Sequence, residues 1–326
     1  MNPLRQIIDR FKGKRVVVFG DLVADVFVYG EISRISREAP VLILNHRETQ
    51  IVPGGGANAI HNLAALGARP IPVGIVGDDA EGQRLIACFA GLGIGVGGIV
   101  MAKSYRTPSK TRILAGAVHS QRQQIVRLDA GAPLRDDKAR QAAERKFKLA
   151  IQDADGLLVS DYGYGLANPQ VIAKTWKNSI PATIDSRFSL LSFSGMTAAT
   201  PNEPEVETAL GVSIGDDAGK LEWAGRTLLR KLKHEALLIT RGKDGMALFE
   251  RGKKTTHIPI HGSDEVADVT GAGDTVIATF TLALAGGASY AEAARLANYA
   301  GGIVVMKYGT RPVTRDELVQ AVEADA

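Results

Sequence analysis

The sequence predicts a doubly wound α/β fold with a mostly parallel sheet, helices on both of its faces, and a small β-sheet lid. Short, continuous apolar runs alternate with helical patterns along nearly the whole chain of 326 residues. This alternation is typical of a parallel sheet whose strands are buried on both faces. Two segments, 26–52 and 107–128, interrupt it with strand-like pieces and no helix between them. We therefore expect one domain over residues 1–326, with these two segments as its lid.

The expected strands of the main sheet are short apolar runs. The first spans 15–20 and ends in Gly20-Asp21, so polar groups follow its carboxyl end. The others lie at 71–76, 156–160, 180–185, 236–240 and 246–249. In the lid, strand-like pieces are expected at 26–29, 41–44, 49–52, 111–115 and 124–128. Because open α/β sheets bind ligands outside the carboxyl ends of their strands, we expect the lid to lie over that crevice.

Helical periodicity fills the stretches between these runs. In residues 3–12 the apolar side chains recur at the spacing of an amphipathic helix. Further helices are expected at 57–66, 80–90, 137–152, 203–210, 217–233, 273–285 and 290–305.

Composition and charge exclude several classes of protein. The 39 Lys and Arg residues barely outnumber the 35 Asp and Glu residues, and no long basic run occurs, so nucleic acid is not an expected partner. A single cysteine, Cys88, excludes an intramolecular disulfide framework and any multi-cysteine metal site. No apolar stretch reaches the length of about 18 residues that suggests a membrane span. The charged segment Met1–Lys14 lacks the apolar core of a signal peptide, so we expect a cytoplasmic protein.

The glycines gather in clusters, and the most informative cluster precedes the helix expected at 273–285. It lies within Asp268-Val269-Thr270-Gly271-Ala272-Gly273-Asp274. A glycine-rich turn that runs into a helix N-terminus points several backbone N–H groups at one spot, and the helix dipole adds positive charge there. The turn at 271–273 is therefore a predicted anion site.

Asp274 places a carboxylate beside that anion site, and two interpretations stand. A carboxylate next to a bound anion is unfavourable unless it has a task, such as taking a proton from an incoming hydroxyl. Alternatively, Asp274 is an acidic residue in the first turn of a helix, where it complements the dipole. The residues alone do not decide between the two.

Two other polar segments open predicted helices. Gly54-Gly55-Gly56-Ala57-Asn58 allows the backbone to approach a small polar ligand that Asn58 would bind, although Asn58 is equally suited to local hydrogen bonds. In Asn202-Glu203-Pro204-Glu205 the spacing favours a capping box, with Asn202 as the N-cap. The same pair, Asn202 and Glu205, would also suit a phosphate-bound Mg²⁺ and its waters.

Two known nucleotide-binding motifs are not predicted for this sequence. The run Gly93-Ile94-Gly95-Val96-Gly97-Gly98 satisfies G-x-G-x-x-G, but it precedes a strand, whereas the dinucleotide fingerprint joins a strand to a helix. No Gly-Lys pair is followed by Ser or Thr, so a Walker A loop is absent from the sequence.

The three glycine-centred segments, in this order on one doubly wound sheet, resemble the ribokinase/PfkB family of carbohydrate kinases over nearly the whole chain. Gly54-Gly55 with Asn58 is similar to the first signature of that family, and 268–274 is similar to its second. The resemblance implies a sugar kinase that uses ATP and Mg²⁺, with Asp274 as general base. The backbone of Gly271, Ala272 and Gly273 would hold the transferred phosphoryl group.

The resemblance also implies roles for residues outside the second signature. Glu205, with Asn202, would act on Mg²⁺ through water. Asp21, Asn58 and the Gly54-Gly55 backbone would bind sugar hydroxyls. Asp268 and Thr270 would lie at a site for a monovalent cation such as K⁺, together with 305–309. The remaining nucleotide contacts implied are Thr240, Gly242, Gly245 and Asn298.

Within the family, the sequence is most similar to the bacterial D-glycero-D-manno-heptose 7-phosphate kinases of lipopolysaccharide-core synthesis. The similarity is carried by Gly20-Asp21 and by the segments 33–40, 110–112 and 160–165, the last of which holds Asp161. It implies phosphorylation of the anomeric hydroxyl to give heptose 1,7-bisphosphate. Some of these kinases are fused to a nucleotidyltransferase, for which the residues after 315 leave no room, so we expect the kinase alone.

The sequence departs from that subfamily at three places near the predicted site. Arg37 stands where Pro is usual, and Tyr164 replaces a usual Lys. Asp185-Ser186-Arg187 takes the place of Asp-Pro-Lys, and Arg and Lys differ in phosphate geometry. These three departures bear on the choice of acceptor and leave the residues implied for the phosphoryl transfer unchanged.

A phosphorylated sugar requires cations around its far end. The candidates are Arg34, Arg37, Lys110 and Arg112 in the lid and Arg187 at the crevice, although each also fits a solvated or lid-stabilising role. The edges of the lid strands favour a homodimer formed through the lid. Two alternative functions stay open: another sugar, sugar-phosphate or nucleoside kinase of this fold, and a non-catalytic ligand-binding regulator on the same scaffold.

Overall fold

The computed structural model describes residues 2–116, 123–177, 179–262 and 268–325. Their main sheet has nine strands in the order β13-β12-β11-β10-β9-β8-β1-β4-β5, and β12, which pairs antiparallel with both β11 and β13, interrupts an otherwise parallel arrangement. This confirms the doubly wound, mostly parallel sheet. The strands are β1 (Arg15–Gly20), β4 (Arg69–Gly77), β5 (Ile99–Ala102), β8 (Gly156–Asp161), β9 (Ala182–Ser186), β10 (Ala198–Ala199), β11 (Ala236–Thr240), β12 (Met246–Glu250) and β13 (Thr256–Ile258).

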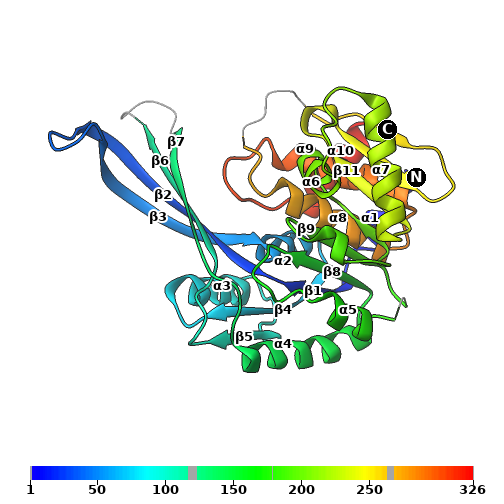
Figure 1. Ribbon diagram of the computed structural model, residues 1–326, viewed down its shortest axis with the longest axis horizontal. Coiled ribbons are helices and arrows are strands. Elements are labelled where there is room, and N and C mark those ends of the chain that lie inside the picture. The colour runs from blue at the N-terminus through cyan, green and yellow to red at the C-terminus, as the bar shows by residue number, and fades with distance from the viewer. Residues whose placement is uncertain (1, 117–122, 178, 263–267, 326) are drawn as a thin grey trace.

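Helices cover both faces of this sheet (Figure 1). On one face lie α1 (Pro3–Asp9), α2 (Gly56–Ala65), α3 (Ala80–Gly91), α8 (Ala272–Ala285), α9 (Tyr290–Val304) and α10 (Arg315–Ala324). On the other lie α4 (Asp137–Ala150), α5 (Pro169–Thr175), α6 (Glu203–Leu210) and α7 (Ala218–Leu232). Short 3-10 turns occur at η1 (Ile151–Asp153), η2 (Leu190–Ser192) and η3 (Gly242–Asp244).

The central strand β1 shows why its sequence is continuously apolar. Val16 and Val18 pack into the core beneath α8 and α9, whereas Val17 and Phe19 pack into the core beneath α4 and α7. Phe19 stacks on Phe147 of α4 with ring centroids 4.2 Å apart. Because successive side chains of a strand point to opposite faces, a strand covered on both sides needs apolar residues at every position.

The lid is a separate four-stranded sheet in the order β3-β2-β6-β7. It projects from the body as a long twisted ribbon (Figure 1). Its strands are β2 (Leu22–Ile35), β3 (Leu42–Gly55), β6 (Ser109–Gly116) and β7 (Gln123–Ala130). β2 pairs antiparallel with β3 and parallel with β6. The inner end of this sheet reaches the carboxyl edge of the main sheet, because β2 follows β1 directly and β3 runs into α2.

The lid differs in detail from the sequence-based expectation. The prediction of three separate strands in 26–52 is wrong. This segment forms parts of two long strands, β2 and β3, whose pairing has register shifts at Tyr29/Gly30 and Ile32/Arg34. Those irregularities break the apolar–polar alternation that would have revealed a single strand. The polar turn expected between the two strands of the 107–128 segment lies at 117–122, outside the described residues.

Several elements of the body were also not anticipated. The first helix ends at Asp9, and α5, α10, β10 and β13 were missed. Asn168 caps α5 and Pro169 opens it, a start signal that was present in the sequence. β10 has only two residues, too few for any periodic pattern. Among the described residues, no helix is both long and apolar enough to cross a membrane.

Candidate active site

Two adjoining cavities lie along the carboxyl edge of the main sheet. The larger has a volume of about 560 Å³ and the smaller about 230 Å³. They share Asn202, Thr240 and Gly273 in their linings, so they meet at the start of α8. This is the place where open α/β sheets bind ligands. We call them the large cavity and the small cavity.

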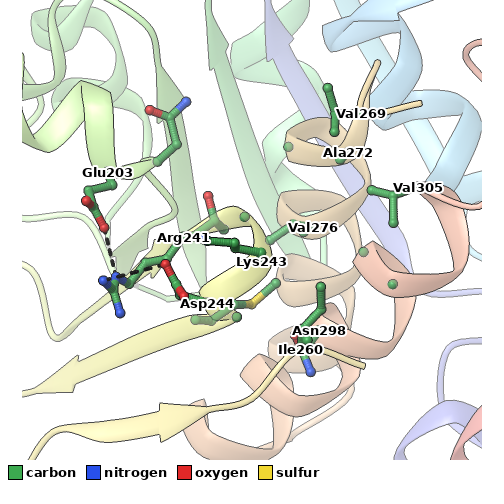
Figure 2. A pocket seen from close by; sticks show the side chains of 18 of the residues that line it. Glu203, Arg241, Lys243, Asp244, Ile260, Val269, Ala272, Val276, Asn298 and Val305 are labelled. Atoms are coloured by element: carbon green, nitrogen blue, oxygen red, sulfur yellow. Dashed lines mark hydrogen bonds and ion pairs between the residues drawn. The ribbon is translucent and has the colours of Figure 1, made fainter. Parts of the chain in front are cut away.

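The large cavity lies between the turn after β11 and the helices α8 and α9. Figure 2 shows Val269, Ala272 and Val276 of the α8 region facing Lys243 and Asp244 of the turn. The Glu203 carboxylate forms an ion pair with Arg241 of this turn, with 2.8 Å between Oε2 and Nε. Gly242 and Gly245 both have positive φ, and a Cβ on Gly245 would collide with the backbone of Ile258. The predicted nucleotide contacts Asn202, Thr240, Gly242, Gly245 and Asn298 all line this cavity.

The glycine turn before α8 has the geometry of an anion site. Gly271 is the N-cap residue, with a φ of +78°, in the left-handed region where glycine is favoured. The Ala272 N–H donates to the Val269 carbonyl, which removes one donor of the predicted set. Within the described chain, the N–H groups of Gly271, Gly273 and Asp274 have no backbone or side-chain acceptor. They remain free to bind an anion in the small cavity.

Asp274 lies in the first turn of α8, 5% exposed, and lines the small cavity. Each of its carboxylate oxygens accepts one hydrogen bond. The Asn58 amide donates to Oδ2 at 3.0 Å and the Tyr162 hydroxyl to Oδ1 at 2.7 Å. Burial raises the pKa of Asp274 from 3.8 to about 6, while these two hydrogen bonds and the nearby Lys110 oppose the rise. The side chain is thus a carboxylate near neutral pH with a stronger affinity for a proton than usual.

The lid supplies two of the three cationic side chains that line the small cavity. Arg112 is buried and pairs with Asp25 at 2.6 Å, and the other oxygen of Asp25 accepts from Thr310. Lys110 lies over the ring of Tyr162, 4.5 Å from its centroid, and loss of solvation lowers its pKa. Arg187, at the end of β9, stacks on Phe188. Among the described residues, neither Lys110 nor Arg187 has a carboxylate in ion-pair contact, so both are available to an anionic ligand.

A second carboxylate in the small cavity was not predicted as a site residue. Asp185 is the next-to-last residue of β9, and its side chain makes no hydrogen bond or ion pair with the residues that the structure describes. Burial and the neighbouring charges of Glu205 and Asp274 raise its pKa well above the usual value. The hydroxyl of Thr200, on the same cavity wall, is buried without a partner in the described chain. An ionisable carboxyl group without a partner beside an unpaired hydroxyl suits a cation better than an apolar ligand.

Asn202 and Glu205 form the capping box at the start of α6 that their spacing indicates. Asn202 accepts from the Glu205 N–H at 2.9 Å, and the Glu205 carboxylate accepts from the Asn202 N–H at 3.0 Å. Both residues also line the small cavity. Loss of solvation raises the pKa of Glu205. The capping role and a role toward a ligand are therefore compatible.

The structure does not bring every predicted residue to the cavities. Asp21 and Asp161 are buried and line neither cavity, and Asp21 accepts from the N–H groups of Tyr162 and Tyr164. Asp161 accepts from Ser186 and from the Gly163 N–H, so both carboxylates shape the loop after β8. Arg34 is exposed in the outer half of β2 and lines neither cavity.

The glycines at the end of β3 have different positions. Gly55 lines the small cavity, and Gly54 lies against the carboxylate of Asp25, which a Cβ would approach to 2.6 Å. Asp268 accepts from the N–H groups of Thr270 and Gly309 and so ties the turn before α8 to the loop after α9.

Sequence reasoning missed Asp25 and Thr310. Asp25 lies within an apolar strand, where a buried carboxylate is unusual enough to have been a signal. Its partner Arg112 comes from a strand 87 residues away, so the pair itself was not visible in the sequence.

Comparison with solved structures identifies the fold. The fold is that of the ribokinase-like proteins. The structure of Arabidopsis thaliana ribokinase complexed with ribose and ATP matches with a TM-score of 0.74 and 23% identity, covering 96% of this chain and 99% of that one. The structure of phosphofructokinase-2 from Escherichia coli in complex with substrates and products matches with a TM-score of 0.78 and 20% identity, covering 95% and 99%.

The chain belongs to the pfkB family of carbohydrate kinases, whose family model matches residues 14–316, and is thus an enzyme of the sugar-kinase class. It is 42% identical to the bifunctional protein HldE of Geobacter sulfurreducens over 93% of this chain. It is 37% identical to the bifunctional protein HldE of Pelobacter propionicus over 98% of this chain. The chain spans 62% and 65% of the lengths of these two relatives.

Proposed function

We propose that this protein transfers the γ-phosphoryl group of ATP to the anomeric hydroxyl of D-glycero-D-manno-heptose 7-phosphate. The observation that carries the proposal is the position of Asp274, a buried carboxylate at the glycine-opened start of α8, where the two cavities meet. The large cavity would hold the nucleotide and the small cavity the sugar phosphate. The similarity to two proteins named HldE supports the heptose acceptor. Residues 1–326 would act as one kinase domain with its lid.

The mechanism is an in-line displacement at the γ-phosphorus. The sugar hydroxyl oxygen bonds to phosphorus as the bond to the β,γ-bridging oxygen breaks, and the electron pair leaves with ADP. The hydroxyl proton passes to the carboxylate of Asp274. The free N–H groups of Gly271, Gly273 and Asp274 would stabilise the charge on the transferring oxygens. Phosphoryl transfer depends mainly on such positioning and charge stabilisation.

Mg²⁺ fits the wall of the small cavity formed by Asp185, Glu205 and Thr200. The unpartnered carboxylate, the second carboxylate and the unpaired hydroxyl are the hard oxygen donors that this ion prefers, directly or through water. When bound, Mg²⁺ would neutralise charge on the nucleotide phosphates.

We also propose K⁺ at the loop of Asp268 and Thr270, and a homodimer through the lid. Ile32, Ile35, Val41 and Leu42 are exposed in the lid, as are Ile125, Val126 and Leu128.

The free cations of the small cavity would bind the phosphate that the acceptor already carries. We expect Lys110→Met and Arg187→Met each to raise KM for the sugar phosphate roughly 10-fold or more, the loss of one charged hydrogen bond. Arg34→Met is the matched control, because Arg34 is a lid cation that lines neither cavity. Steady-state kinetics with varied acceptor measure the effect. An equal rise of KM in Arg34→Met would contradict this assignment.

The pH dependence follows from the raised pKa of Asp274. A general base acts only when it is deprotonated, so turnover should fall as the pH drops through the pKa of about 6 and stay level above it. A pH profile of kcat/KM with saturating Mg-ATP gives this limb. An acidic limb at pH 4, where an ordinary Asp titrates, would show that Asp274 does not carry the proton.

The acceptor is tested by ADP release from Mg-ATP across a panel of compounds. The panel contains heptose 7-phosphate, fructose 1-phosphate, fructose 6-phosphate, ribose and adenosine. Turnover confined to the heptose phosphate is the expected result. Turnover on another compound would retain the mechanism and replace the acceptor. No turnover with any of them, despite ATP binding, would favour a ligand-binding regulator.

A further inference from the structure

We infer that Asn62, a buried residue that touches no ligand cavity, is a positioning residue: it fixes the amide of Asn58 so that its NH₂ group faces Asp274. The inference rests on the proposed role of Asp274 as general base. Asn62 is fully buried in α2, one helical turn after Asn58, and lines neither cavity. Its helix neighbours Ile60 and Leu63 are buried apolar residues, so an amide at this position requires a reason.

The orientation of both amides follows from a backbone group. The N–H of Val313 can only donate, and it donates to Oδ1 of Asn62 at 3.1 Å. The NH₂ group of Asn62 therefore points the other way and donates to Oδ1 of Asn58 at 3.1 Å, and also to the Asn58 carbonyl at 3.0 Å. With its oxygen occupied in this way, Asn58 must present its NH₂ group on the opposite side.

We call the hydrogen bonds that join Asn62, Asn58 and Asp274 the relay. At its Asp274 end, the groups that face the Asn58 amide can only accept hydrogen bonds. The NH₂ group of Asn58 donates to Oδ2 of Asp274 at 3.0 Å and to the Gly271 carbonyl at 3.2 Å. Asn58 thus connects Asp274 with the glycine turn before α8. A Cβ on Gly271 would lie 2.5 Å from Nδ2 of Asn58. If the Asn58 amide turned over, its oxygen would face both of these acceptors. Asn62 prevents that rotation.

Other groups around Asp274 also affect its pKa, and their effects must be distinguished from the effect of Asn62. The Tyr162 hydroxyl binds Oδ1 from the loop after β8, and Lys110 faces it from β6. Asp25 of β2 adds negative charge near Asp274, whereas Asp185 of β9, which interacts with Asp274, has its own pKa raised well above the usual value. In the described chain the Asn62 side chain hydrogen-bonds only with Asn58 and Val313 and with none of these residues, so a change at Asn62 reaches Asp274 through Asn58.

The decisive substitution is Asn62→Asp, which keeps the size of the side chain and, in its ionised form, replaces the NH₂ group by a second acceptor. The Asn58 amide should then turn over and present its oxygen to Asp274. We expect kcat to fall at least about 10-fold and the acidic limb of the pH profile to move up by about one unit, because a hydrogen bond to the ionised form is lost. KM for ATP should change less than about twofold, since the large cavity is untouched.

The matched control is Thr281→Val, an isosteric change that also removes a buried hydrogen bond. Thr281 lies on the same helix as Asp274 and pairs with Thr183 at 2.6 Å, remote from both cavities. This variant should lower thermal stability while leaving the position of the acidic limb unchanged. A shift of the limb in Thr281→Val would mean that loss of stability alone produces the effect.

A second readout needs no turnover and so stands apart from the identity of the acceptor. Asn62→Asp is combined with Asp274→Asn, whose amide can donate to a turned Asn58 oxygen. Asn62→Asp should lower the urea midpoint of the wild-type chain at least about twice as much as it lowers the midpoint of the Asp274→Asn chain. The two losses should differ because substitutions at coupled neighbouring residues are not additive. Equal losses in the two backgrounds, or an unmoved acidic limb, would overturn the inference. If Asn62→Asp does not fold, Asn62→Ser replaces it in both measurements, with smaller shifts of the same sign expected.

Discussion

Asp274→Asn is expected to lower kcat by about 10²–10⁴-fold, the range that a positioned general base supplies. The amide keeps the size of the side chain and one acceptor for Asn58 or Tyr162, but it cannot take the proton of the sugar hydroxyl. The large cavity contains no part of this side chain, so the affinity for ATP should stay within about twofold. Turnover by single-turnover quench and ATP binding by calorimetry measure the two effects separately.

The same variant carries its own control for folding. Burial raises the pKa of Asp274 above that of an unfolded chain, so the folded state binds the proton more tightly and loses stability as the pH rises from about 4 to about 6. Asp274→Asn removes this cost. It should therefore be more stable than the wild type at pH 8 and approach it near pH 4, as urea melts would show. A variant that is inactive and also less stable at pH 8 would contradict this account of the base.

Arg112→Met is expected to have the largest effect on stability, about 3–5 kcal/mol, the usual cost of removing one partner of a buried ion pair. Arg112 and Asp25 are both buried, and without the guanidinium the carboxylate retains, among the residues that the structure describes, only the Thr310 hydroxyl. Urea denaturation gives the free energy of unfolding.

The double variant Asp25→Asn/Arg112→Met separates the pair from its surroundings. Because it leaves no unpaired charge, it should recover part of the lost stability. If the double variant is as unstable as the sum of the two single variants, then the two residues are not coupled as their 2.6 Å contact indicates.

The architecture was predictable because its signals are local. Continuous apolar runs such as 15–20 indicate strands covered on both faces, and the glycine turn at 271–273 announces a helix start. The lid strands were less visible because bulges interrupt their alternation. Those features depend on pairing with a strand elsewhere in the chain, which periodicity along one segment does not contain.

The site was predictable to the extent that its residues belong to a local motif. Asp274 and its turn were found because they lie within seven consecutive residues, 268–274. The partners that change the pKa of Asp274 were not found: Tyr162 lies 112 residues away, and Asn58, predicted to bind sugar or to form local hydrogen bonds, lies 216 residues away. Lys110 and Arg34 looked alike as lid cations, and only the sheet geometry brings the first to the cavity and leaves the second outside.

The central proposal is transfer of a phosphoryl group to the anomeric oxygen of a sugar that already carries a phosphate. Phosphorus NMR of the product formed from Mg-ATP and D-glycero-D-manno-heptose 7-phosphate tests it most directly, with Asp274→Asn as the blank. The account predicts a new phosphorus signal coupled to the anomeric proton, equal in amount to the ADP released, and almost none in the blank. A phosphoryl group on another hydroxyl, ADP without a sugar bisphosphate, or an equal signal from Asp274→Asn would contradict it.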